Sequence, residues 1–396
     1  MTEFSKDIDG FRAKVPVTKD WAYLITASTG LVPDFVYEGA RRYMDARYLA
    51  GGDSVWEYPD GQVGTLGMME RSKRALGEML GCAPERICFG QSATQMFTMV
   101  TEGIDYAPDA NVVTVGEGWI GNRFAWQKRE SEGLEVRYAA STGGVITVEA
   151  LMALCDEHTA AVTINSVESE TGYRADLKKL GSFCRERGIL LFVDAVQSAG
   201  ALITDFDGCN IDFLVGNDYK WMMNFCGTGY ACVGERVMPL IKRWGAGWMS
   251  DAERFNTAKA HLDLRSDAGR FEIGYPNAPG VYGLGLAAMQ YSMLGPENVE
   301  NYVRSLAEYC IECAGATPGV RCTLNIPYER RSQIVMLSFD GSIAATDEDF
   351  KAARVFAPGF SAPDANGERR ARLSFHYYNN REDIDRFFAV IRASRR

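Results

Sequence analysis

Short runs of apolar residues alternate with longer amphipathic stretches through the first two thirds of the chain. The apolar runs lie at residues 86–89, 111–115, 134–138, 160–165, 189–193 and 211–215. Runs of this length are typical of strands that are buried on both faces. The amphipathic stretches between them predict helices that cover the two faces of a sheet. The pattern therefore predicts an α/β fold with a mostly parallel sheet.

Helical patterns precede this region, and a different rhythm follows it. Residues 33–52 and 65–81 each carry a helical pattern, the first opened by a proline and closed by two glycines. After two further helical stretches, residues 321–396 alternate between strands and helices in a new order. The change predicts a large domain over residues 1–285, with the N-terminal segment, and a smaller C-terminal α+β domain over residues 286–396.

Composition and charge narrow the class of protein. A chain of 396 residues is long enough for two cores. Its formal net charge of −10 repels polyanions, so we expect neither a nucleic-acid nor a membrane partner, although a local pocket could still bind a phosphate. The start of the chain is charged, and no apolar run approaches the length of a membrane span. We therefore expect a cytoplasmic protein.

The ten cysteines do not form a disulfide pattern. Several stand in apolar contexts, where a reduced and buried thiol is the ordinary explanation. Cys310 and Cys313 form a C-x-x-C pair inside a helical pattern, but no second pair stands at zinc spacing. We predict no metal site.

Three polar segments stand at the ends of predicted strands, where an open parallel sheet binds its ligands. Residues 90–95 open a helix whose backbone N–H groups suit a phosphate, or they are only a helix cap. Asp194 could bind a cationic heterocycle; alternatively, it could cap a helix or form one half of a buried ion pair. The apolar residues beside Lys220 would lower the pKa of its amine and make it more nucleophilic. Alternatively, the side chain extends along an apolar surface and places its amine in solvent.

Together these segments resemble the class V aminotransferases, which are pyridoxal 5′-phosphate (PLP) enzymes of fold type I. The family includes cysteine desulfurases, alanine–glyoxylate aminotransferases and isopenicillin N epimerase-like enzymes. The core of the resemblance is Val193-Asp194-Ala195-Val196-Gln197-Ser198-Ala199-Gly200, followed by Asp212, Lys220 and Gly227-Thr228-Gly229. Further matches lie at residues 168–172, 270–277 and 372–385.

The resemblance implies a role for each matching residue. Lys220 would bind PLP as a Schiff base and move the substrate Cα proton, while Asp194 would pair with the pyridine nitrogen. Arg372 would hold the substrate carboxylate through two hydrogen bonds. Further contacts are implied to the cofactor ring from Trp119, Val196, Gln197 and Ser169, and to the phosphate from Ala93, Thr94, Asn217 and Tyr219.

Two positions depart from the family pattern. Tyr275 stands where many relatives have a threonine that reaches the phosphate of the second subunit, so a phenol would replace that contact in the homodimer that the resemblance implies. Residues 355–368 contain no cysteine, whereas desulfurases carry their persulfide nucleophile in this loop. Desulfuration by that route is therefore not expected.

The resemblance implies an enzyme that transforms an amino acid through a Cα carbanion, and we favour an aminotransferase. A lyase that eliminates at Cβ, as in C–S cleavage, and an epimerase begin with the same carbanion and stay open as alternatives. A PLP-fold binding protein without catalysis is a further alternative. A dinucleotide enzyme is disfavoured, because Cys232 stands where the glycine fingerprint that begins at Gly227 needs its last glycine.

Overall fold

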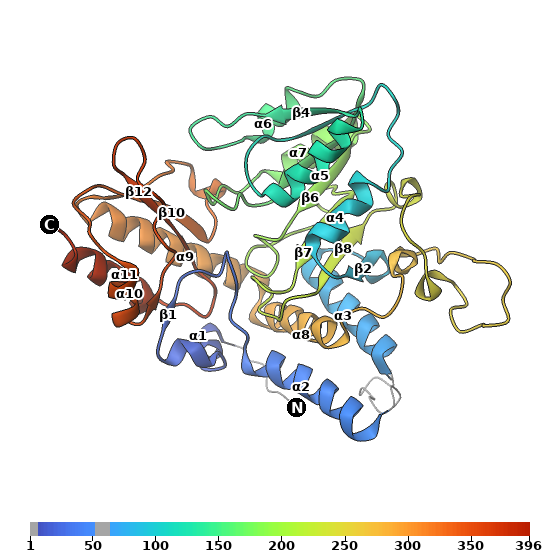
Figure 1. Ribbon diagram of the computed structural model, residues 1–396, viewed down its shortest axis with the longest axis horizontal. Coiled ribbons are helices and arrows are strands. Elements are labelled where there is room, and N and C mark those ends of the chain that lie inside the picture. Colours follow the sequence, from blue (N-terminus) through green and yellow to red (C-terminus); the bar gives the residue numbers. More distant parts are fainter. Residues whose placement is uncertain (1–6, 52–63) are drawn as a thin grey trace.

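The structure, a computed structural model, describes residues 7–51 and 64–396. Its centre is a seven-stranded sheet with the strand order β2-β8-β7-β6-β5-β3-β4 (Figure 1). The strands are β2 (Ile87–Gly90), β3 (Asn111–Val115), β4 (Glu135–Ala139), β5 (Thr159–Asn165), β6 (Leu190–Asp194), β7 (Phe213–Asn217) and β8 (Gly229–Val233). Only β8 runs against its neighbours, so the expected mostly parallel sheet is confirmed. The sequence pattern did not predict β8.

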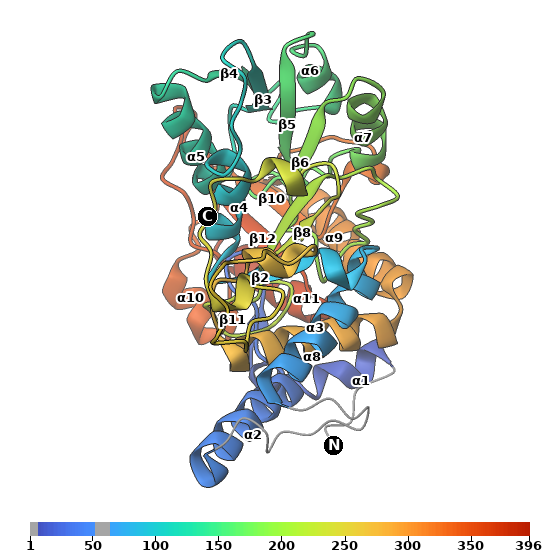
Figure 2. The same cartoon turned by 90° about the vertical axis from the view of Figure 1, so that its right-hand side faces the viewer.

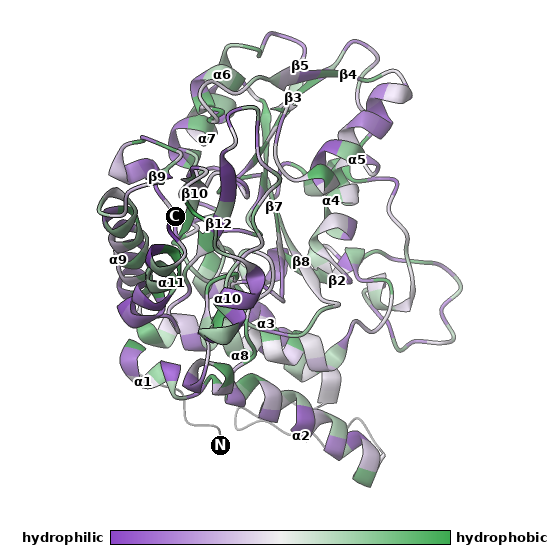
Figure 3. Ribbon diagram, turned by 60° about the vertical axis from the view of Figure 1, so that its left-hand side comes forward, coloured by the Kyte–Doolittle hydropathy of each residue, from purple (hydrophilic) through white to green (hydrophobic). Residues whose placement is uncertain are grey.

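Helices cover both faces of this sheet, as Figure 2 shows. The helices that follow strands are α4 (Ala93–Thr101), α5 (Ile120–Ser131), α6 (Val148–Met152) and α7 (Leu177–Glu186). The strands between them are mostly hydrophobic, whereas the outer helices also carry hydrophilic residues (Figure 3). This burial on two faces explains why the strands appear in the sequence as short continuous apolar runs.

Three long helices pack together beside the sheet. They are α2 (Asp34–Ala50), α3 (Gly64–Leu80) and α8 (Ala278–Leu294), with the short α1 (Ile8–Arg12) before them. α2 and α3 correspond to the two predicted N-terminal helices, although Gly52 lies outside the described residues. Among the helices that the structure describes, none combines the length and the apolar character needed to cross a membrane.

The C-terminal part has its own three-stranded antiparallel sheet, in the order β12-β10-β9. Its elements are α9 (Pro296–Gly315), β9 (Val320–Cys322), β10 (Ile334–Phe339), α10 (Asp347–Ala352), β11 (Val355–Phe356), β12 (Arg369–Ser374) and α11 (Arg381–Ala393). β1 (Ala22–Tyr23) pairs in parallel with β11, and Ala22 and Leu24 pack into the hydrophobic core of this part. The N-terminal segment therefore joins the two parts of the molecule. The domain division at residue 285 stays a proposal, and that residue lies within α8.

Candidate active site

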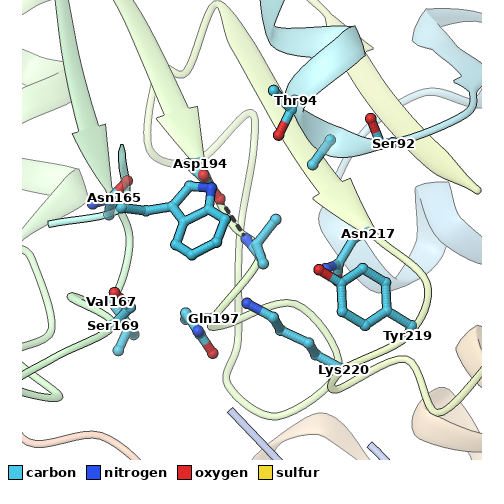
Figure 4. A pocket seen from close by; sticks show the side chains of 13 residues that line it. Ser92, Thr94, Asn165, Val167, Ser169, Asp194, Gln197, Asn217, Tyr219 and Lys220 are labelled. Atoms are coloured by element: carbon cyan, nitrogen blue, oxygen red, sulfur yellow. Dashed lines mark hydrogen bonds between the residues drawn. The ribbon is translucent and has the colours of Figure 1, made fainter. Parts of the chain in front are cut away.

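A pocket opens at the carboxyl ends of β6 and β7, where the three polar segments of the sequence come together (Figure 4). Its lining includes every predicted site residue except Tyr275 and Arg372. It adds Ser92, from the predicted helix start at residues 90–95, and two residues that the sequence did not single out, Asn165 and Val167. The lining residues are Ser92, Ala93, Thr94, Trp119, Asn165, Val167, Ser169, Asp194, Val196, Gln197, Asn217, Tyr219 and Lys220.

Lys220 extends into the pocket from the turn after β7, and it is only 7% exposed. Its Nζ lies 5.5 Å from the ring centroid of Trp119 and 5.9 Å from that of Tyr219. Burial lowers the pKa of its amine to about 8. The nearby charge of Asp194 opposes this shift, and the charge of Arg372 adds to it by a smaller amount. The neutral, nucleophilic form of the amine is therefore far more populated near neutral pH than in an ordinary lysine.

Asp194 is the last residue of β6 and is buried. Its Oδ1 accepts a hydrogen bond of 2.8 Å from the Val196 backbone N–H, and its Oδ2 accepts one of 2.6 Å from Asn122 Nδ2. Both donors are neutral, and burial raises the pKa of the carboxyl above its usual value. A cationic group in the pocket would compensate the buried negative charge.

One wall of the pocket is suited to an anion. Ser92 caps α4 by accepting a hydrogen bond of 3.1 Å from the Gln95 N–H. The N–H groups of Ala93 and Thr94 lie in the first turn, where a helix offers them no internal acceptor. A Cβ on Gly229 would stand 2.6 Å from the Ala93 nitrogen, so glycine at this position allows β8 to support the start of the helix. The arrangement suits a phosphate.

Trp119 and Gln197 complete the opposite side. Trp119 stands directly before the first residue of α5 with 48% of its surface exposed, so the indole ring is available for stacking. Gln197 accepts a hydrogen bond of 2.8 Å from Trp221 Nε1 and donates one of 3.1 Å to the Ala27 carbonyl. These bonds hold the amide in place and leave its Nε2 one hydrogen for a ligand.

Arg372 lies on β12 beside the pocket, on the C-terminal part of the molecule. Its guanidinium donates hydrogen bonds of 2.8 Å to the Ser169 carbonyl and of 2.8 Å to Ser28 Oγ. Its nearest carboxylate oxygen, on Glu170, is 4.0 Å away, and burial lowers its pKa. The guanidinium is therefore held by neutral groups, with its charge available to an incoming carboxylate.

Tyr275 does not join this pocket. It is 51% exposed and packs edge-on against Trp248, with ring centroids 5.0 Å apart. The sequence predicted a contact between Tyr275 and the phosphate of a second subunit. That contact stays a prediction, because the structure describes one chain.

The donor set fits PLP. The open helix end matches the phosphate, the buried carboxylate of Asp194 matches a protonated ring nitrogen, and the Trp119 ring matches a flat heterocycle. Lys220 supplies a partly neutral amine for the aldehyde carbon. The helix end, Asp194 and Lys220 reach one pocket because β6 and β7 are neighbours and α4 begins at the same edge of the sheet.

Known proteins resemble this chain in sequence and in fold. Residues 22–387 match the model of the aminotransferase class-V family. An uncharacterized aminotransferase YcbU of Bacillus subtilis is 20% identical over 94% of each chain. A probable cysteine desulfurase of Pyrococcus abyssi is 23% identical over 96% of each chain.

Solved structures share the fold at low sequence identity. The cystine C–S lyase C-DES, in complex with cysteine persulfide, has a TM-score of 0.82 at 16% identity and covers 96% of this chain and 100% of its own. The apo cysteine desulfurase of Thermococcus onnurineus has a TM-score of 0.78 at 18% identity and covers 99% of this chain and 98% of its own. With the family model matched over nearly its whole length, the chain belongs to the aminotransferase class-V family and is a PLP-dependent enzyme of fold type I.

Proposed function

We propose that the pocket between β6, β7 and α4 is the active site, that Lys220 binds PLP covalently through Nζ, and that the substrate is an α-amino acid. The observation that carries this proposal is a buried lysine with a pKa of about 8 that shares one pocket with a buried aspartate. Asp194 would face the ring nitrogen. Gln197 and Ser169 would bind the ring oxygen, and Ala93, Thr94, Asn217 and Tyr219 would hold the phosphate.

The protein residues would then bind the substrate and move its proton. Arg372 would bind the carboxylate through charge-assisted hydrogen bonds and so orient the Cα–H bond toward Lys220. Once the substrate amine has displaced it from the cofactor, Lys220 Nζ would accept that proton, for which a pKa near the working pH is favourable. When bound, PLP withdraws electrons from the substrate Cα, which stabilises the charge left by the proton.

Among the reactions that begin in this way, we propose elimination at Cβ, with a sulfur-containing amino acid as substrate. Several reported relatives carry names that describe C–S chemistry. Residues 355–368 have no cysteine, so sulfur would leave directly and not on a protein thiol of that loop. The sequence alone favoured an aminotransferase, and the relative YcbU keeps transamination as the second candidate.

Two further features belong to the proposal. We propose a homodimer in which Tyr275 approaches the phosphate of the second subunit. Trp248, Phe255 and Tyr275 form a cluster of exposed aromatic rings on one chain, and an interface would cover them. A cytoplasmic location stays a prediction.

Incubation with an amino-acid panel that includes L-cysteine and L-cystine tests the reaction type. Elimination should release ammonia and a keto acid in equal amounts, with the visible cofactor absorbance recovering without an added keto acid. An aminotransferase would lose that absorbance until a keto acid is supplied. Lys220→Ala serves as the inactive control. A persulfide on a cysteine that turnover requires, for example the exposed Cys226, would defeat direct elimination.

A further inference from the structure

Two buried asparagines connect Asp194 to a second carboxyl group. Asn122 Nδ2 donates to Asp194 Oδ2 at 2.6 Å and to Asn165 Oδ1 at 3.1 Å. Asn165 Nδ2 in turn donates to Glu168 Oε2 at 3.3 Å. Asp194, Asn122, Asn165 and Glu168 therefore form one chain of hydrogen bonds along the wall of the pocket, which we call the asparagine relay.

The two carboxyl groups fix the direction of both amides. An ionised Asp194 can only accept, so Asn122 must turn its NH₂ group toward it. The second hydrogen of that NH₂ group then requires the oxygen of Asn165, whose own NH₂ group faces Glu168. No amide in the relay can be flipped without placing two donors or two acceptors against each other.

The backbone around Trp119 leaves room for this relay. Gly118 has a φ of 105°, and a Cβ there would stand 2.6 Å from Glu168 Oε2 and 3.1 Å from Asn165 Nδ2. The segment that carries Trp119 into α5 is therefore shaped around the relay, and Asn122 stands one turn into the same helix with 6% of its surface exposed. Asn122 thus links the expected stacking residue and the expected anchor of the ring nitrogen.

We infer that Asn122 is a positioning residue, which holds the Asp194 carboxylate in the orientation that receives a protonated ring nitrogen. The inference rests on the proposed function, because it takes Asp194 as the partner of that nitrogen. Asn122 does not line the pocket, and it acts through Asp194 alone. A donor at this position favours the ionised form of Asp194 against the effect of burial and directs its carboxylate, while the Val196 N–H holds its other oxygen.

Asn122→Asp tests this inference, because it keeps the shape of the side chain and replaces the donor with an acceptor. Asn111→Asp is the matched control, since Asn111 is also a buried asparagine that donates to an aspartate, Asp156, at 2.8 Å, but at the start of β3. Both variants are expected to lower thermal stability. Only Asn122→Asp should weaken the binding of PLP to the apoenzyme, by about tenfold to hundredfold, and shift the visible absorption maximum of the holoenzyme.

Asn122→Ser supplies a second readout, because its hydroxyl can still donate. It should retain more of the wild-type absorption spectrum than Asn122→Ala, which has no donor at this position. If wild-type protein binds PLP and Asn122→Asp binds it with the same affinity and spectrum, the positioning role is wrong. If wild-type protein itself fails to bind PLP, the proposed function has failed and not the relay alone.

Discussion

Buried charges in the active-site pocket and buried charges elsewhere in the core are compensated in different ways. Asp212, at 2% exposure, accepts a hydrogen bond of 2.9 Å from the Leu191 N–H and forms an ion pair with Arg236 at 3.2 Å. Lys73, at 3% exposure, pairs with Glu272 at 3.1 Å. Each of these charges finds its counter-charge within the protein, as buried ions usually do.

Asp194 and Arg372, at the proposed active site, have only neutral partners at hydrogen-bond distance. Asp194 is held by a backbone N–H and an asparagine, and Arg372 by a carbonyl and a hydroxyl. Asp194 and Lys220 favour each other's ionised forms only through a longer-range attraction. Their missing counter-charges are those that a bound PLP and a substrate carboxylate would bring, so the comparison separates binding residues from structural ones.

Replacing the two buried lysines should give the largest contrast. Lys220→Ala is expected to abolish turnover and the visible cofactor absorbance while the protein stays folded, because it removes a desolvated amine with no ion partner. Lys73→Ala is expected to cost about 3–5 kcal/mol of unfolding free energy, because it leaves Glu272 buried and unpaired. Absorption spectra and denaturant titrations of both variants measure these effects. Retained turnover in Lys220→Ala would show that the buried lysine of the pocket is not needed for catalysis.

The two arginines should differ in substrate dependence. Arg372→Ala is expected to raise the amino-acid concentration needed for half saturation. The rise should correspond to a loss of about 2–5 kcal/mol of binding free energy, because a desolvated charge pair loses one partner. Arg236→Ala should lower stability and leave that concentration unchanged. Steady-state kinetics decide between them. An equal response of α-amino acids and their decarboxylated amines to Arg372→Ala would show that Arg372 does not bind the carboxylate.

The two aspartates sharpen the comparison further. Asp194→Asn should reduce turnover, because it removes a contact with the cofactor worth about 1.5–3 kcal/mol. The free energy of unfolding should stay nearly unchanged, because burial already disfavours the charge that the substitution removes. Asp212→Asn should instead destabilise the fold by about 1–3 kcal/mol, because Arg236 loses its partner, and should leave the cofactor spectrum intact. The reverse pattern in paired melting and kinetic experiments would contradict both assignments.

The smallest expected effect is a pH dependence of the apoprotein. Burial lowers the pKa of Lys220 to about 8 from the usual 10.5, so between these values the unfolded chain binds more protons than the native one. The contribution of Lys220 to stability therefore rises with pH across this window, by on the order of 2 kcal/mol. The difference between the unfolding free energies of wild-type and Lys220→Ala apoprotein, followed over pH, should show this slope. A flat difference would mean that the amine is not desolvated.

The sequence predicted most of the architecture because most of the buried strands are short, largely apolar runs. Asp194 and Asn217, expected just after their strands, are in fact the last residues of β6 and β7. β8 escaped prediction because its five residues begin with Gly229 and follow directly on a glycine-containing segment, which looks like a loop. In this sheet the local pattern thus located the strands more reliably than their ends.

The site was predictable where residues match a family motif and unpredictable where packing alone assembles it. Asn122 lies 72 residues from Asp194 in the sequence, and within a helical pattern an asparagine resembles an exposed polar residue. Asn165 gave no separate signal either, because it is the last residue of β5 and a polar residue commonly ends an apolar run. A polar residue one turn after the expected stacking tryptophan was the only available hint.

The central claim is that Lys220 is the residue that binds PLP. Wild-type protein loaded with PLP should be reduced with borohydride, digested, and examined by mass spectrometry. We predict one phosphopyridoxyl adduct, on the Nζ of Lys220, with the visible absorbance lost on reduction. An adduct on another lysine, or none in protein that binds PLP, would contradict the account.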